Sequence, residues 1–224
     1  MNISLDVLKK YGACDPGIEC FKYLKTTTVH ETINKCMDLS DDVVLQWTND
    51  VLDKYKWCSW LLSRILPKDE NIKYAIYSAR LVIDIFEKIY PNDNRPRKAI
   101  EAAELYLEGK VTKEQIGDAA DAAYAAYADA AYAAYVANTA VNAAAYADAA
   151  YAAYAAANAA AIYAADAAYA AIKSAAYAAD VAADIANYAA YAAIKSAAYA
   201  DREEMFRSII TYGLTLISES EVVE

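Results

Sequence analysis

The residues best placed to do chemistry in this sequence are tyrosines that recur three residues apart in its second half. The pairs are Tyr124 with Tyr127, Tyr132 with Tyr135, Tyr151 with Tyr154, and Tyr188 with Tyr191. Residues three apart face the same side of a helix, so each pair places two rings together. Paired rings can stack on a planar ligand or clamp a partner. They can equally fill the gaps between packed helices with their hydroxyls at the surface.

Ten tyrosines are therefore candidate binding residues. They are Tyr124, Tyr127, Tyr132, Tyr135, Tyr151, Tyr154, Tyr169, Tyr177, Tyr191 and Tyr199. The last four belong to the decapeptide YAAIKSAAYA, which occurs at residues 169–178 and again at 191–200. In each copy the two tyrosines lie about 80° apart in helical angle, and the isoleucine lies about 60° to the other side of the first tyrosine. The repeat thus predicts one buried helix stripe used twice, with tyrosine edges where a ligand would bind.

Aspartates are the second chemical feature of this half, and we expect them on solvated helix faces. They are Asp121, Asp129, Asp148, Asp166, Asp180 and Asp184, offset by Lys173 and Lys195. An acidic surface that bears tyrosine suits a basic protein partner, because tyrosine supplies rigid contact area and charge steers association.

The sequence contains no recognised motif for catalysis or for metal binding. It has a single histidine, His30, and no Gly-rich phosphate loop, GxSxG, HExxH or DxDxDG pattern. Its four cysteines include no CxxC pair; they are Cys14, Cys20, Cys36 and Cys58. We therefore expect reduced, buried structural thiols, no metal, no cofactor and no enzymatic activity.

The charge of the chain narrows the class of partner. Its net charge is −10, whereas nucleic-acid binders usually show a basic patch. The first 15 residues lack the apolar core of a signal peptide. No window of about 20 uncharged apolar residues appears before residue 118, and Asp, Asn or Lys interrupts the weakly apolar runs after it. We expect a cytoplasmic protein that binds neither nucleic acid nor membrane.

Helices must position these residues. In the first half we expect four helices over residues 4–11, 40–67, 69–90 and 96–108, with a loop at 91–96. Two further helices should begin at Asp15, as N-cap, and at a capping box formed by Thr28 and Glu31. A second capping box at Thr112–Gln115 opens the alanine-rich half, where Gly and Pro are absent from residues 121–200. Helix breaks are expected at 136–142, at Asn158 and within 180–187, before a last helix over 201–217.

Three stretches together resemble a known family. They are LKKYGACDPGIECFKYL at residues 8–24, WLLSR at 60–64, and KYAIYSARLVIDIFEKIYPNDNRPRKAIEAAELYLEGKVT at 73–112. With the alanine-rich tail, this combination is similar to bacterial and phage immunity proteins of polymorphic toxin systems and to related phage proteins. The resemblance implies a non-enzymatic protein that binds and neutralises a partner inside the cell. A phage member could instead bind a host immune protein or take up a small nucleotide signal.

These observations predict an all-α protein, a compact multi-helix bundle with a globular N-terminal region at 1–117 and Ala/Tyr-rich helices at 118–224 packed on it as one unit. The expected function is occlusion of a protein toxin or host immune effector. The alternative is a sponge for a small nucleotide-like ligand, held in a tyrosine-lined pocket. A purely structural rod and a homo-oligomer remain open.

Overall fold

The computed structural model describes residues 1–143, 162–163, 165–171, 173, 190, 192 and 202–221. These residues form helices joined by turns and contain no strand apart from an isolated antiparallel bridge between Asn2 and Thr28, which confirms the all-α class. The chain divides into two compact units. Unit 1 is Met1–Leu66 with Glu203–Glu224, and unit 2 is Pro67–Arg202, so the division does not follow the change of composition near residue 117.

Unit 1 is built from short helices and the C-terminal helix. They are α1 (Leu5–Lys10), α2 (Asp15–Leu24), α3 (Val29–Met37), α4 (Asp41–Val44), α5 (Asp53–Ile65) and α12 (Arg202–Glu221), which begins one residue before the unit does. The Thr28 hydroxyl accepts from the Glu31 amide, as its capping pattern predicts. Asp15 is the first helical residue rather than the N-cap. The N-cap is Cys14, whose side chain makes no capping hydrogen bond.

The helix expected over 40–67 is two helices, α4 and α5, separated by a turn. Three polar side chains hold this turn: Asp50 accepts from the Leu52 amide at 3.0 Å, and the Thr48 hydroxyl donates to Asp53. Short polar side chains that bond to the nearby backbone compete with helical hydrogen bonds. The expectation of one continuous helix was therefore wrong at this turn.

Unit 2 contains α6 (Lys68–Arg80), α7 (Ile83–Ile89), α8 (Arg95–Leu107) and α9 (Lys113–Ala143). The single helix expected over 69–90 is divided at Val82, which leaves the helical region with φ −124°. Gly109 ends α8 with φ +69°, a conformation that favours glycine. The second capping box is complete, because Thr112 and Gln115 each accept a hydrogen bond from the other's amide.

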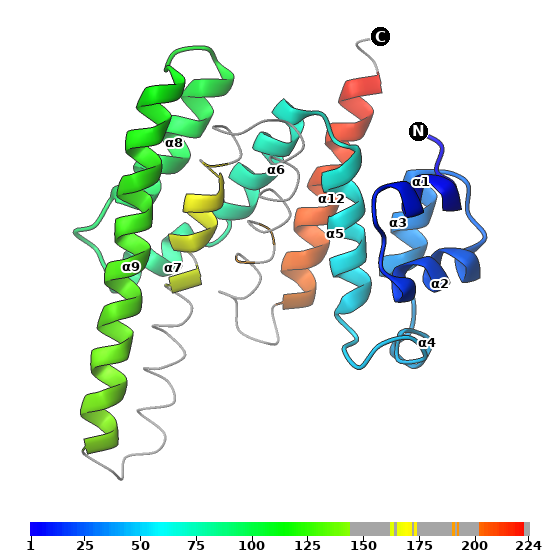
Figure 1. Ribbon diagram of the computed structural model, residues 1–224, viewed down its shortest axis with the longest axis horizontal. Helices are drawn as coiled ribbons and strands as arrows, with labels where there is room; N and C mark the ends of the chain where they lie inside the picture. The colour runs from blue at the N-terminus through cyan, green and yellow to red at the C-terminus, as the bar shows by residue number, and fades with distance from the viewer. Residues whose placement is uncertain are drawn as a thin grey trace. The chain divides into compact units, whose positions relative to one another are not determined.

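Helices α8 and α9 pack side by side through small residues (Figure 1). Ala99 and Ala103 of α8 and Ala123 and Ala126 of α9 are buried, and alanine at a helix contact allows close approach. Helix α9 continues through residues 136–142, so the break expected there is wrong. The breaks expected at residue 158 and at 180–187 lie outside the described residues.

Candidate tyrosine and carboxylate surface

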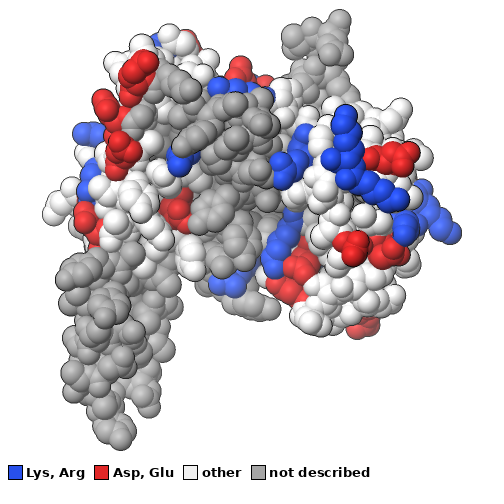
Figure 2. Space-filling model, viewed as in Figure 1, with Lys and Arg blue, Asp and Glu red and all other residues white. Residues whose placement is uncertain are grey.

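The exposed face of α9 carries a line of carboxylates. Glu114, Asp118 and Asp121 lie four and three residues apart, which places them on one side of the helix, and all three are exposed. Ile116 and Ala123 lie on the opposite side and are fully buried. Figure 2 shows acidic side chains over the upper part of α8 and α9. We call Glu114, Asp118 and Asp121 the acidic stripe. Because the opposite face of α9 is buried in unit 2, the acidic stripe faces the solvent.

Three of the ten candidate tyrosines meet on the flank of α9 beside the acidic stripe. The ring centroid of Tyr124 lies 6.1 Å from that of Tyr127 and 5.3 Å from that of Tyr169, with the ring planes tilted by 35° and 49°. Tyr124 is 53% exposed, whereas Tyr127 and Tyr169 are half-buried. We call these three residues the tyrosine cluster. It presents one open ring that two other rings support.

Two charged residues lie on the segment that carries Tyr169. Asp166, Tyr169 and Lys173 follow one another at spacings of three and four residues, and residues 165–171 are helical. The Lys173 Nζ lies 5.0 Å from the centroid of the Tyr169 ring. Asp166 is only 6% exposed, so its expected place on a solvated face is wrong. Burial, together with the nearby Asp166 carboxylate, raises the pKa of Tyr127.

The remaining candidate tyrosines fall where the structure gives no side-chain geometry. Tyr132 and Tyr135 lie on α9, but the structure does not describe their side chains. Five others lie outside the described residues: Tyr151, Tyr154, Tyr177, Tyr191 and Tyr199. Sequence reasoning did not assign Asp166 and Lys173 to the cluster. Their spacing from Tyr169 is the signal that could have done so, because it places all three on one helix face.

An open hollow of about 580 Å³ lies at the loop between α7 and α8 and is lined by residues 89–95. Two of its lining residues are charged, Asp93 and Arg95. Arg95 donates from Nε and Nη2 to the Asp93 carboxylate and from Nη2 to Asp129 of α9 at 2.8 Å. The pair with Asp93 lowers the pKa of that carboxyl group. Because two carboxylates neutralise Arg95, its evident role is to tie the loop to α9.

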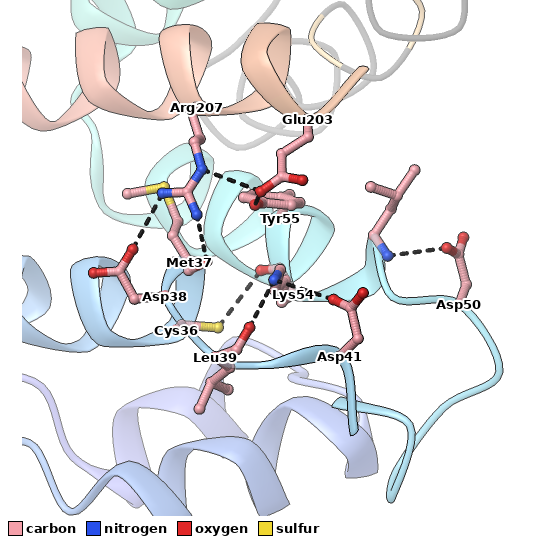
Figure 3. Close-up of polar contacts among 11 residues, drawn as sticks. Cys36, Met37, Asp38, Leu39, Asp41, Asp50, Lys54, Tyr55, Glu203 and Arg207 are labelled. Atoms are coloured by element: carbon pink, nitrogen blue, oxygen red, sulfur yellow. Dashed lines mark hydrogen bonds and ion pairs between the residues drawn. The ribbon is translucent and has the colours of Figure 1, made fainter. Parts of the chain in front are cut away.

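In unit 1 a group of polar contacts joins α12 to α3 and α5 (Figure 3). Arg207 of α12 donates from Nη1 to Asp38 at 3.2 Å, from Nη2 to the Met37 carbonyl at 3.0 Å and from Nε to Glu203 at 3.3 Å. The Tyr55 hydroxyl of α5 donates to the same Glu203 carboxylate. The fork of a guanidinium suits this bridging geometry, and the contacts fasten α12 to the N-terminal helices.

Tyr55 is the buried member of this group. Its ring stacks on Phe206, with centroids 5.3 Å apart and planes at 17°. Burial and the hydrogen bond to Glu203 raise the pKa of Tyr55, and the same bond lowers the pKa of Glu203. Both shifts keep Tyr55 a donor and Glu203 an acceptor at neutral pH. The hydrogen bond between them therefore helps to hold α12 against α5.

A buried lysine and a pair of thiols lie close by. The Lys54 ammonium donates to the Leu39 carbonyl at 2.7 Å, and the Cys36 thiol donates to the Lys54 carbonyl at 3.5 Å. The sulfurs of Cys36 and Cys20 lie 3.6 Å apart as free thiols, and their hydrogen bond together with burial raises the pKa of Cys20. Cys14 is exposed, which corrects the expectation that every thiol is buried.

Within the described parts of the chain, no three His, Cys, Asp or Glu side chains are grouped so that they could hold a metal ion. In those same parts, every helix is too short or too polar to cross a bilayer. No protein-family model matches this sequence, and no significant similarity to a curated protein or to a solved structure is found.

Proposed function

We propose that this protein is a non-enzymatic, intracellular binding protein of the toxin-immunity or phage counter-defence type. It neutralises a basic protein toxin or immune effector by covering that partner's working surface. The observation that supports this function is the exposed ring of Tyr124, which is supported by two further rings and lies beside the acidic stripe.

The two parts of this surface contribute differently to binding. Tyrosine gives a large contact area with few rotatable bonds, and the neighbours of Tyr124 already restrict its ring, so little freedom is lost on binding. The carboxylates of the acidic stripe attract a basic partner over distances of about 8–10 Å at physiological salt. The net charge of −10 acts in the same direction.

A sponge for a nucleotide signal is less well supported by this geometry. A base sandwiched between two rings needs about 7 Å between their planes, because each contact takes about 3.5 Å. The rings around Tyr124 are closer than that and tilted, with centroids at 5.3 and 6.1 Å. The acidic stripe would also repel phosphate groups. Nucleotide binding is therefore an outcome that the experiment tests rather than a second proposal.

The proposed function assigns no chemical step to the protein. The polar contacts around Arg207 and Tyr55 fasten α12, and their pKa shifts favour a stable donor and a stable acceptor. The carboxylates of the acidic stripe are exposed to solvent, which suits them to steering a charged partner.

The test is a comparative capture by tagged protein from cells that encode the candidate toxin or effector. The wild type is compared with Asp118→Asn/Asp121→Asn, which neutralises the acidic stripe, and with Asp6→Asn/Asp42→Asn, which removes the same charge from exposed positions of unit 1. We expect the wild type and the unit 1 variant to capture the same basic protein and to inhibit its activity at equimolar ratio. The stripe variant should lose most of both.

Two outcomes would overturn the proposed function. Equal capture and inhibition by all three proteins would show that the acidic stripe does not bind the partner. A nucleotide that co-purifies with the wild type and raises its melting temperature, without any protein partner, would support the sponge instead.

A further inference from the structure

An ammonium group already lies on the tyrosine cluster. The Lys173 Nζ is 5.0 Å from the centroid of the Tyr169 ring, within the distance at which a cation is attracted to the negative face of an aromatic ring. The Tyr169 ring is in turn 5.3 Å from the ring of Tyr124. The chain itself therefore shows how a lysine fits against one member of this cluster.

The adjoining member of the cluster is open to a group from outside. Tyr124 keeps 53% of its surface exposed. Asp121 lies one helical turn before it and is also exposed. An incoming cation would thus meet an aromatic ring together with a carboxylate that can balance its charge.

The tilt of the rings selects among cations. Arginine presents a flat guanidinium that stacks parallel to a ring, whereas lysine presents a compact ammonium with three donors. The ring planes of the cluster are inclined by 35° and 49° and form no parallel-sided slot. A compact ammonium fits against such inclined faces better than a planar group does.

We propose that the tyrosine cluster is a docking site for a lysine side chain of the protein partner, whose ammonium lies on Tyr124 and pairs with Asp121. This inference rests on the proposed function and names the chemical group that the surface recognises. The aliphatic stem of the same lysine would lie along the ring, as lysine stems do on apolar surfaces.

The experiment uses the full chain and a fluorescent peptide of alternating lysine and glycine, with its lysine-acetylated form and its arginine form as comparison probes. The protein variants are Tyr124→Leu, which removes the ring, and Tyr124→Phe, which keeps it. Tyr11→Leu removes an exposed ring from unit 1 and is the matched control. Melting temperatures confirm that each variant is folded.

We expect the lysine peptide to bind the wild type, Tyr124→Phe and Tyr11→Leu alike and to bind Tyr124→Leu about two- to fivefold more weakly, the size of an exposed cation–π contact. The arginine form should bind more weakly than the lysine form, and the acetylated form should not bind. The inference is overturned if the wild type does not bind the lysine peptide, or if Tyr124→Leu binds it as tightly as Tyr11→Leu does.

The charge variant separates this inference from the proposed function. If Asp118→Asn/Asp121→Asn weakens capture of the protein partner while Tyr124→Leu leaves peptide binding unchanged, the acidic surface stands and the lysine site is wrong. If capture is unaffected by the charge variant, the proposed function fails on its own test, whatever the peptide shows.

Discussion

The ring of Tyr124 on α9 lies 5.3 Å from the ring of Tyr169, a residue from a separate helical segment. The contact turns two tyrosines that are far apart in sequence into one surface, and the Lys173 ammonium lies on its inner member. Alanines are buried on both segments, Ala123 and Ala126 on α9 and Ala168 and Ala170 beside Tyr169, and small residues allow neighbouring backbones to come close.

The alanine face of α9 provides a first prediction. Ala123→Leu adds bulk to a fully buried position and should destabilise the protein by about 1–3 kcal/mol through overpacking. Ala125→Leu makes the same change on the exposed side of the same helix and should change stability by less than about 0.5 kcal/mol. Urea unfolding followed by circular dichroism measures both, and equal midpoints for the two variants would contradict the packing of α9.

A second prediction separates the contribution of the Tyr55 ring to stability from that of its hydroxyl group. Tyr55→Phe keeps the stack on Phe206 and loses the hydrogen bond to Glu203, which should cost about 1 kcal/mol. Tyr55→Ala also removes the buried ring and should cost about 3–5 kcal/mol. The free energy of unfolding of each variant tests the order, and a phenylalanine variant as unstable as the alanine variant would show that the ring contributes little.

Acid should weaken the ion pair between Arg97 and Glu87. Two hydrogen bonds from Arg97 lower the pKa of Glu87 below its ordinary value of 4.5. When folding lowers the pKa of a carboxyl group, the ionised group stabilises the protein at every pH above its pKa in the unfolded chain. That stabilisation is lost as the pH falls through the lowered pKa of the folded state.

The pair is partly exposed, so Glu87→Gln should cost about 1 kcal/mol or less at pH 7. The difference in unfolding free energy between wild type and variant should shrink below pH 4.5. A difference that stays constant down to pH 3, measured by urea titration at each pH, would show that the charge of Glu87 is irrelevant.

The thiols should fall into two classes of reactivity. Cys14 is exposed, whereas Cys20, Cys36 and Cys58 are buried. A thiol reagent such as dithionitrobenzoate should therefore label one cysteine rapidly in the native protein and all four after denaturation. Cys14→Ser should abolish the fast phase, and a fast phase that survives this change would contradict the burial of the other three.

Local signals in the sequence predicted most helices and several of their starts, including two that begin at capping threonines. Thr28 and Thr112 act through hydrogen bonds to residues three positions away, so the sequence contains both partners of each cap. The turn between α4 and α5 also had a signal, the polar run from Thr48 to Asp50, which the apolar periodicity obscured. The break at Val82 has no such signal, because neither glycine nor proline marks it.

The candidate surface was predictable in composition but not in arrangement. Spacing placed Tyr124 and Tyr127 on one helix face, which the structure bears out. The approach of Tyr169 and the burial of Asp166 depend on tertiary packing, which periodicity does not encode. The same holds for Arg207, which joins the C-terminal helix to Met37 near the start of the chain.

The central claim is that the carboxylates of α9 attract and hold a basic protein. Its most direct measurement is the association rate constant of the captured partner with wild type, Asp118→Asn/Asp121→Asn and Asp6→Asn/Asp42→Asn, by biolayer interferometry at about 0.05 M and about 0.3 M salt. At low salt the stripe variant should associate about tenfold more slowly than the other two, and the gap should narrow at high salt. Equal rates for all three proteins at low salt would contradict the account.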